Sequence, residues 1–237
     1  VGGCAGAGIL KGLVDSAPDI SNLSVTPSET ATYIYDQNGT AMQKLTLASS
    51  NRTLVTLDQI PEDLQHAVVA IEDQRFYQHK GIDIPGIARA FVVGITSGSF
   101  SEGASTITQQ LAKNLYVSQE KTMNRKAAEV FLALELERNY TKDEILELYV
   151  NSIYFGDGYY NVGEASEGYF GKPAAKMNDY ECTLLAGVPN APSKYAPSKN
   201  LALAEKRQKK VISRMEACGY LTKEDTTLMS AELVAMN

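Results

Sequence analysis

The chain has 237 residues, of which 44% are hydrophobic and 21% charged, a balance typical of a globular domain with enough length to bury a core. The formal charge is −6, from 22 basic and 28 acidic residues, so the average surface repels phosphate and an anionic ligand needs a local basic patch. Three scattered cysteines and two histidines exclude a zinc site and argue against a disulfide framework.

The first 31 residues are expected to lie outside the domain, which we predict over residues 32–237. Residues 1–14 contain the apolar run VGGCAGAGIL, which is too short to cross a bilayer because a spanning helix needs about 20 apolar residues. We predict that these residues are the tail of a membrane-anchor helix that begins before this chain, with a trimmed signal peptide as the alternative. Residues 15–31 are rich in Ser, Pro and Asp and are predicted to be a linker.

Residues 32–57 carry the β-favouring part of the sequence. In TYIYDQNGTAMQKLTL (32–47), Asn38 and Gly39 are the pair that a type I′ turn prefers, which predicts a β-hairpin. The stretch RTLVTL (52–57) is a candidate third strand.

From Pro61 onward the pattern is helical. Pro61 suits a first helical position, and apolar residues follow at the spacing of one helical face, at Leu64, Ala67, Val68 and Ile71. This pattern places Glu72 beside the buried face, near the end of the helix.

Further helical segments follow. Residues 85–98 have one charged side chain, Arg89, and predict either a core helix or a segment that touches lipid. Residues 105–116 and 122–139 are predicted helices, and Thr141 and Glu144 form a capping box for the next one. A last helix runs from about 201 to 217, after a region broken by glycines. One side of the 122–139 helix is predicted to carry Ala127, Ala128, Phe131, Leu134 and Arg138. The predicted fold is mainly α, with a small N-terminal β element.

Glu72 and Asp73 are the first candidates for chemistry. Acidic pairs near helix ends are usually solvated surface, so the pair alone indicates little. Here an apolar face ends beside Glu72, Phe76 lies one turn on, and Gly81 allows close approach of another backbone. A carboxyl group that is partly shielded from water has a raised pKa and can act as a general base near neutral pH.

A polar stripe on the predicted 105–116 helix is the second candidate. Its residues recur at helical spacing and include one ammonium group: Thr106, Gln110, Lys113 and Asn114. Such groups suit an oxygen-rich ligand such as a sugar or a phosphate, and a helix start near Ser105 favours an anion. The alternative is a solvated face with Ser105 as the N-cap.

Arg125, Lys126 and Glu129 form the third candidate cluster. Arg125 and Glu129 are one turn apart, and spacing alone favours a simple ion pair between them. The functional alternative gives Arg125 and Lys126 to a diphosphate, with Glu129 orienting them or binding a divalent cation.

Five stretches, in order, together resemble glycosyltransferase family 51, the peptidoglycan polymerase domain of class A penicillin-binding proteins and monofunctional transglycosylases. EDQRFYQHKG is similar to the first motif of that family, GASTITQQLAKN to the second, and RKAAE to the third. KDEILELYVNSIYFGDG resembles the fourth, and EKRQKKVISRM is a weaker match to the fifth. The resemblance covers about residues 58–217.

The resemblance implies a bilobal, lysozyme-like helical fold on the outer face of a bacterial cytoplasmic membrane. Glu72 then corresponds to the catalytic base, Glu129 to a second catalytic residue or metal ligand, and residues 85–98 to a mobile region that dips into the bilayer. The residues expected to bind substrate or shape its site are Asp73, Phe76, His79, Ser105, Thr106, Gln110, Lys113, Asn114, Arg125, Lys126, Lys206 and Arg207.

Two positions depart from the family pattern. The fifth motif usually carries Arg-Arg-Asn where this chain has Arg207, Gln208 and Lys209, and Asn190 stands where Gln is common. Both changes keep polar side chains, but they leave the roles of Lys206 and Arg207 open.

The implied reaction is polymerisation of lipid II into glycan strands. Glu72 would deprotonate the acceptor hydroxyl, which would attack the donor MurNAc C1 with inversion and release undecaprenyl pyrophosphate.

Mg²⁺ or another divalent cation at Glu129 is the expected cofactor. The expected partners are lipid II, the glycan chain, membrane lipid and other cell-wall synthesis proteins, but not nucleic acid. A lysozyme-like muramidase and a non-catalytic membrane scaffold are the alternatives. The terminal SAELVAMN favours a chain that is a piece of a longer, bifunctional protein.

Overall fold

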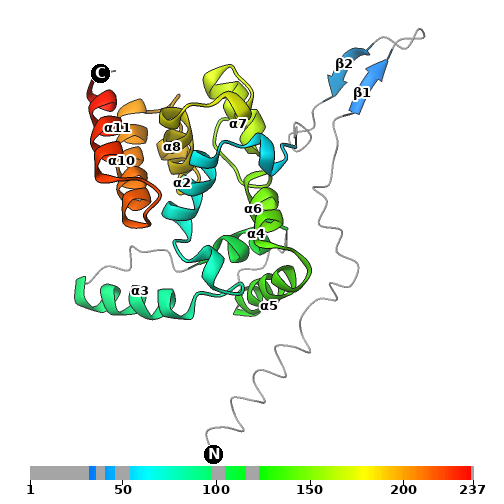
Figure 1. Ribbon diagram of the computed structural model, residues 1–237. Helices are drawn as coiled ribbons and strands as arrows, with labels where there is room; N and C mark the ends of the chain where they lie inside the picture. Colours follow the sequence, from blue (N-terminus) through cyan, green and yellow to red (C-terminus); the bar gives the residue numbers. More distant parts are fainter. Residues whose placement is uncertain (1–31, 36–40, 46–53, 98–104, 116–122, 236–237) are drawn as a thin grey trace, which may run out of the picture. The chain divides into compact units, whose positions relative to one another are not determined.

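The computed structural model describes residues 32–35, 41–45, 54–97, 105–115 and 123–235. The described residues form two compact units, one within Arg75–Ile145 and the other within Pro27–Gln74 and Leu146–Asn237. Helices make up most of both units, as predicted (Figure 1). The predicted anchor tail (1–14) and linker (15–31) lie outside the described residues. None of the described helices combines the length and the hydropathy of a membrane-spanning segment.

The predicted β-hairpin is confirmed. Strands β1 (Thr32–Tyr35) and β2 (Ala41–Leu45) pair antiparallel, with Thr32 opposite Leu45 and an irregularity in register between Ile34 and Tyr35. The turn residues Asn38 and Gly39 lie outside the described part of the chain.

The predicted third strand is wrong for the residues that the structure describes. Residues 54–56 have no regular structure, and Leu57–Gln59 is a 3₁₀-helix, η1. Side chains bind the backbone groups that a neighbouring strand would otherwise bind. Val55 N donates to Asn151 Oδ1 (3.0 Å), and Asn151 Nδ2 donates to the Val55 carbonyl (2.8 Å). Leu57 N likewise donates to Glu147 Oε2 at 2.7 Å. Because these backbone groups are already satisfied, the segment has no need of a neighbouring strand.

The second unit is built around three helices that lie side by side: α2 (Glu62–Glu72), α8 (Asp179–Gly187) and α10 (Leu201–Ala217) (Figure 1). α10 has the predicted bounds, and Pro61 is the N-cap residue of α2 and not its first helical residue. The three helices bury an apolar core that includes Leu64, Val68, Leu185, Val211, Ile212 and Met215. The other elements of the unit are α7 (Val162–Phe170), η3 (Ala174–Lys176), α9 (Pro192–Tyr195) and α11 (Lys223–Ala235).

Polar side chains fix α10 in one rotation against α8. Gln208 is fully buried, and its Nε2 donates to the Tyr180 carbonyl and to Thr183 Oγ1, both at 2.9 Å. The Tyr180 hydroxyl donates to Glu205 Oε1 at 3.1 Å. Buried hydrogen bonds are costly to leave unmade, so they hold the neighbouring residues of α10 in place. Gln208 is one of the departures from the family pattern, and here it has a structural role.

The first unit contains η2 (Phe76–Gln78), α3 (Ile84–Ser97), α4 (Ile107–Leu115) and α5 (Met123–Asn139); the division between the units falls inside α6 (Lys142–Val150). α4 packs on α5. Glu137 links α5 to α4 and to the start of α6. It accepts from Thr108 Oγ1 (2.6 Å) and pairs with Lys142 Nζ (2.7 Å). Lys142 Nζ also lies 4.4 Å from the centre of the Phe76 ring.

The start of α6 was predicted correctly, and the buried side of α5 was not. Thr141 N donates to Glu144 Oε2 (2.7 Å) and Glu144 N donates to Thr141 Oγ1 (3.3 Å), which is the predicted capping box. In α5 the predicted residues Ala128, Phe131 and Leu134 are half-buried, Arg138 is exposed, and the side chain of Ala127 is not described. The buried side is formed by Glu129, Leu132, Ala133 and Leu136. The predicted side and the buried side of α5 differ by one residue, or about 100° around the helix axis. Apolar residues lie on both sides of the surface that contacts α4, so their spacing alone did not show which of them are buried.

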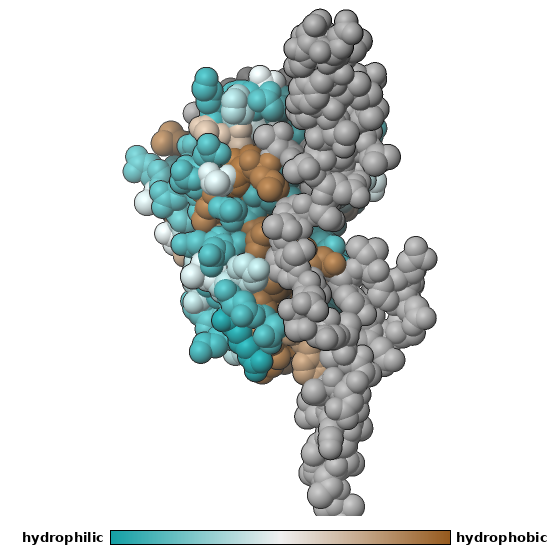
Figure 2. All heavy atoms as spheres, turned by 90° about the vertical axis from the view of Figure 1, so that its right-hand side faces the viewer, coloured by the Kyte–Doolittle hydropathy of each residue, from teal (hydrophilic) through white to brown (hydrophobic). Residues whose placement is uncertain are grey.

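Among the described residues, α3 carries a group of exposed apolar side chains. The face shown in Figure 2 mixes hydrophilic residues with small hydrophobic patches, as most protein surfaces do. On α3, four large apolar side chains are 40–66% exposed: Ile84, Ile87, Val92 and Ile95. The prediction of a core helix is therefore wrong for this segment, and contact with lipid stays a prediction.

Candidate functional site

Glu72 and Asp73 lie at the end of α2 and are shielded from solvent. Glu72 is the last residue of the helix and Asp73 is its C-cap, whose backbone N–H donates to the Val69 carbonyl at 2.9 Å. The Glu72 side chain is 12% exposed and Asp73 is 6% exposed. A solvated acidic pair is therefore the wrong interpretation, and the expected shielding of Glu72 is confirmed.

Among the described residues, Arg207 of α10 is a cation that lies beside Glu72. Its Nη2 lies 4.0 Å from Glu72 Oε1, and its side chain is 10% exposed. The guanidinium carbon also lies 5.8 Å from the centre of the Tyr195 ring. Lys206, the other cation predicted from the fifth motif, is exposed. Arg207 and Lys206, whose roles the sequence left open, therefore differ in burial: Arg207 is shielded beside Glu72, and Lys206 is exposed.

Tyr149 of α6 was missed by the sequence analysis. It is fully buried, and burial, followed by the negative charges of Glu72 and Asp73, raises the pKa of its phenol well above the usual value. The phenol therefore stays neutral beside the two carboxylates. Tyr149 lies within the fourth motif, but the motif alone does not show that the residue lies beside Glu72, because the two are distant in sequence.

In the first unit, the loop after Asp73 is held by its own side chains. Arg75 binds Asp83 through two hydrogen bonds, one of them from Nε to Oδ2 at 3.1 Å, and Asp83 Oδ1 accepts from the Gly86 N–H at 2.9 Å. Phe76 is fully buried, with its ring 6.3 Å from that of His79. The structure thus places the two rings near each other in this loop, and their role in shaping the substrate site stays a prediction.

Gly81 makes the close backbone approach that the sequence predicted. It has a φ of +85°, and a Cβ added there would lie 3.1 Å from the Ala133 carbonyl oxygen of α5. A side chain at this position would meet both backbone strain and a close contact.

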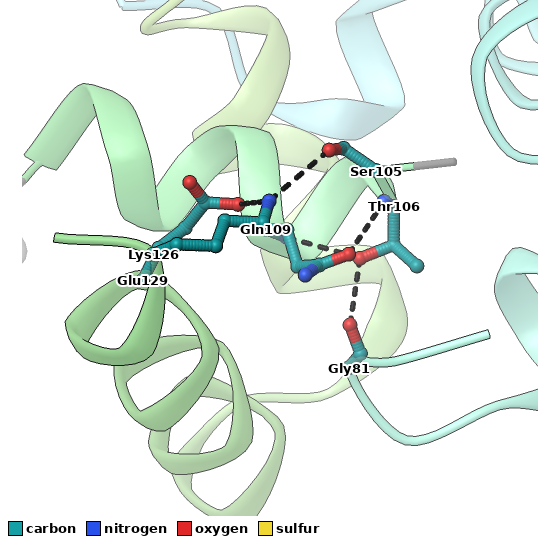
Figure 3. Close-up of polar contacts among 6 residues, drawn as sticks. All are labelled: Gly81, Ser105, Thr106, Gln109, Lys126 and Glu129. Carbon is teal, nitrogen blue, oxygen red and sulfur yellow. Dashed lines mark hydrogen bonds and ion pairs between the residues drawn. The ribbon is translucent and has the colours of Figure 1, made fainter. Parts of the chain in front are cut away.

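Thr106 caps α4 and ties it to this loop (Figure 3). Thr106 N donates to Gln109 Oε1 (3.0 Å) and Gln109 N donates to Thr106 Oγ1 (3.1 Å), so the two residues form a capping box. Thr106 Oγ1 also donates to the Gly81 carbonyl at 2.6 Å. The N-cap is therefore Thr106 and not Ser105, and the helix begins at Ile107. The T-x-x-Q spacing could have revealed Gln109 from the sequence.

We expect Thr106→Val to lower the free energy of unfolding by about 2 kcal/mol. The substitution keeps the shape of a side chain that is 2% exposed, but removes the cap and leaves the Gly81 carbonyl without its donor. Denaturant unfolding measures the loss. Thr96→Val is the matched control, because Thr96 is exposed and donates only to carbonyls of its own helix. Equal effects of the two substitutions would contradict the role of Thr106.

The other residues of the polar stripe on α4 become more exposed to solvent toward the end of the helix. Gln110 is half-buried, and Lys113 and Asn114 are exposed. Thr106, at the buried end, already uses its hydroxyl within the protein. The binding of substrate by these four residues stays a prediction; Lys113 is the one charged residue among the four.

Lys126, Glu129 and Ser105 come together in the first unit (Figure 3). Lys126 Nζ forms an ion pair with Glu129 Oε1 and lies 3.3 Å from Ser105 Oγ. The Glu129 side chain is 8% exposed and that of Lys126 is 55% exposed. The described partner of Glu129 is therefore Lys126. The side chain of Arg125 lies outside the described residues, so the pair between Arg125 and Glu129 stays a prediction.

A metal site at Glu129 stays a prediction. In the described ranges, no three side chains of the His, Cys, Asp and Glu types gather into a metal site. Mg²⁺ is commonly bound by one or two carboxylates together with substrate phosphates and water, and Glu129 can supply one such carboxylate.

Comparison with known proteins identifies the family. The family model described as Transglycosylase matches residues 38–216. The chain is 42% identical over 236 residues to penicillin-binding protein 1A of Escherichia coli, covering 98% of this chain and 28% of that protein. It is 40% identical over 237 residues to penicillin-binding protein 1A/1B of Bacillus subtilis, covering 100% and 25% of the two chains. It is 43% identical over 201 residues to penicillin-binding protein 1A of Aquifex aeolicus, covering 85% and 27%.

The chain therefore spans only 25–28% of the length of these three relatives, and it is the transglycosylase model that accounts for most of its residues. The five motifs of the sequence analysis fall mainly inside the matched range, and the mainly helical structure agrees with the fold that they imply. This chain belongs to the transglycosylase family.

Proposed function

We propose that this domain is a peptidoglycan glycosyltransferase that polymerises lipid II. The observation that carries the proposal is a shielded carboxylate, Glu72, in a chain of the transglycosylase family that also presents a separate set of cations. Lys113 and Lys126 are the described members of that set, and Arg125 is the third by its motif.

The chemistry of the leaving group favours glycosyl transfer over hydrolysis. A glycosidase expels a sugar alkoxide, which is a poor leaving group, so it needs a protonated carboxylic acid as well as a base or nucleophile. A lipid pyrophosphate is much more acidic and leaves without that proton, but it needs positive charge nearby. One base and several cations are the groups that the second reaction requires.

Each residue has a role in the proposed reaction. Glu72 takes the proton from the 4-hydroxyl of the acceptor's GlcNAc, and that oxygen attacks C1 of the donor's MurNAc. The C1–O bond to the pyrophosphate breaks with inversion, and undecaprenyl pyrophosphate leaves as the anion. Lys113, Arg125 and Lys126 stabilise its charge, and Glu129 fixes Lys126. A divalent cation, when bound, would add positive charge at the pyrophosphate, with Glu129 as the residue that would hold it.

The exposed apolar face of α3 supports a site of action at a membrane. Ile84, Ile87, Val92 and Ile95 offer apolar surface to lipid, and Arg89 is exposed on the same helix. A substrate with a long polyprenyl chain is dissolved in the bilayer, so an enzyme that uses it gains from contact with lipid. We place the domain at the outer face of the bacterial cytoplasmic membrane, with lipid II, the growing glycan chain and membrane lipid as partners.

A polymerisation assay tests the proposal. The protein is incubated with lipid II that is labelled in the sugar, with and without Mg²⁺, and the products are separated by gel electrophoresis. We expect a ladder of glycan strands and consumption of lipid II. Release of new reducing ends from finished glycan, without use of lipid II, would indicate a hydrolase, and lipid II binding without turnover would indicate a scaffold.

A further inference from the structure

We propose that Arg207 is a positioning residue for Glu72, which holds that carboxylate ionised and aimed, and not a ligand for the substrate's pyrophosphate. This inference rests on the proposed function, because it assigns the partner of the proposed base. It also gives a role to the residue of the fifth motif that the sequence left open.

The distance and the burial of the two groups support a charge pair. Arg207 Nη2 and Glu72 Oε1 are 4.0 Å apart, and the two side chains are 10% and 12% exposed. A charge that is shielded from water is costly unless an opposite charge compensates it, and the attraction grows as the surroundings become less polar. Arg207 Nε is also buried and has no hydrogen-bond partner among the described residues. Among the described residues, Glu72 is the carboxylate that pairs with the guanidinium.

Three neighbours restrict where Arg207 can go. Gly187 of α8 makes room for its stem, because a Cβ at that position would lie 2.9 Å from Arg207 Cγ. The ring of Tyr195 lies against the guanidinium, with 5.8 Å between the ring centre and Cζ. The buried hydrogen bonds of Gln208, the next residue, fix the rotation of α10. A side chain held in this way is suited to orient a fixed partner.

Among the described residues, Asp73 and Tyr149 are ionisable groups that lie near Glu72 and carry no positive charge. Asp73 is adjacent and negative, and Tyr149 of α6 stays neutral because its pKa is raised. α8 and α10 both pack against α2. α8 carries Asp179, which lies with Asp63 at the opposite end of α2, and Glu205 of α10 is bonded to Tyr180. Arg207 therefore places a positive charge beside a shielded carboxylate that has a second carboxylate, Asp73, next to it in the chain.

The dependence of kcat/KM on pH separates this role from substrate binding. Removal of a cation raises the pKa of the neighbouring carboxyl, so Arg207→Met should move the acid limb of the profile upward by about 1 pH unit. Arg207→Lys, which keeps the charge, should restore most of the wild-type position. Lys210→Gln removes one exposed positive charge from the same helix and should leave the limb unmoved. A raised KM with an unshifted acid limb in Arg207→Met would overturn the inference. An inactive wild-type protein would overturn the proposed function instead.

A stability measurement tests the pair without any turnover. Arg207→Met should lower Tm more in the wild-type background than in the Glu72→Gln background, because in the second case no charge loses its partner. Equal losses in the two backgrounds would contradict the pair. If Arg207→Met does not fold, the double variant decides: its recovery of folding supports the pair, and its failure contradicts it.

Discussion

Glu72→Gln is expected to reduce lipid II polymerisation by about 10²- to 10⁴-fold, the usual contribution of a general base. The amide has nearly the same shape as the carboxylate, so it fits the same space at the end of α2. It cannot accept the proton of the acceptor hydroxyl, and the oxygen that must attack the donor then remains a weak nucleophile. The loss should appear in kcat, because lipid II binding depends on other residues.

The matched control for this variant is Glu167→Gln. Glu167 lies on α7 of the same unit and is exposed, so its replacement removes one negative charge without touching the proposed site. Circular dichroism and thermal unfolding should show that both variants are folded. Turnover close to wild type in Glu72→Gln would remove Glu72 as the base, whereas an equal loss in Glu167→Gln would point to a general effect of charge.

The position of Glu72 could be predicted because it depends on a local pattern. The spacing of Leu64, Ala67 and Val68 defines one face of a helix, and all three are buried in α2. A residue at a known offset from that face, at the helix end, is then placed without knowledge of the rest of the fold. The same local reasoning predicted the capping box at Thr141 and the bounds of α10.

The partners of Glu72 could not be predicted in this way. Tyr149 and Arg207 belong to α6 and α10, which are distant from α2 in sequence, and only the tertiary fold brings these groups near Glu72. In the sequence, Arg207 lies close to two other basic residues, Lys206 and Lys209, both of which are exposed. The burial of the side chain distinguishes Arg207 from the two lysines, and this burial depends on the rotation of α10 that Gln208 fixes.

The wrong predictions share a physical cause. Residues 52–57 have β propensity, but the side chains of Asn151 and Glu147 satisfy the backbone of Val55 and Leu57. The apolar side of α5 was displaced because the helix carries apolar residues over a wide arc, and tertiary contacts select which of them are covered. In both cases an interaction between distant residues outweighs a local preference.

Glu129→Gln is expected to reduce kcat about 10²-fold, comparable to the loss of one preorganised charged contact. The reason is its partner: Glu129 is 8% exposed and pairs with Lys126, which also reaches Ser105. Without the carboxylate, the ammonium group loses the restraint that would aim it at the leaving pyrophosphate. Glu135→Gln is the matched control, because Glu135 makes an ion pair of the same spacing with Arg138 on the same helix, but at a more exposed position.

The combination of this variant with Lys126→Gln separates the two roles proposed for Glu129. If Glu129 acts by orienting Lys126, the double variant should be no slower than the slower single variant, because both substitutions remove one unit. If Glu129 instead holds a divalent cation, the two losses should multiply, and a higher Mg²⁺ concentration should restore activity to Glu129→Gln but not to Lys126→Gln. Wild-type turnover in Glu129→Gln would exclude both roles and leave the charge of the pyrophosphate to Lys113 and Arg125. The direct ion pair with Lys126 favours the first outcome, since a carboxylate that already compensates an ammonium group has less negative charge to offer a metal ion.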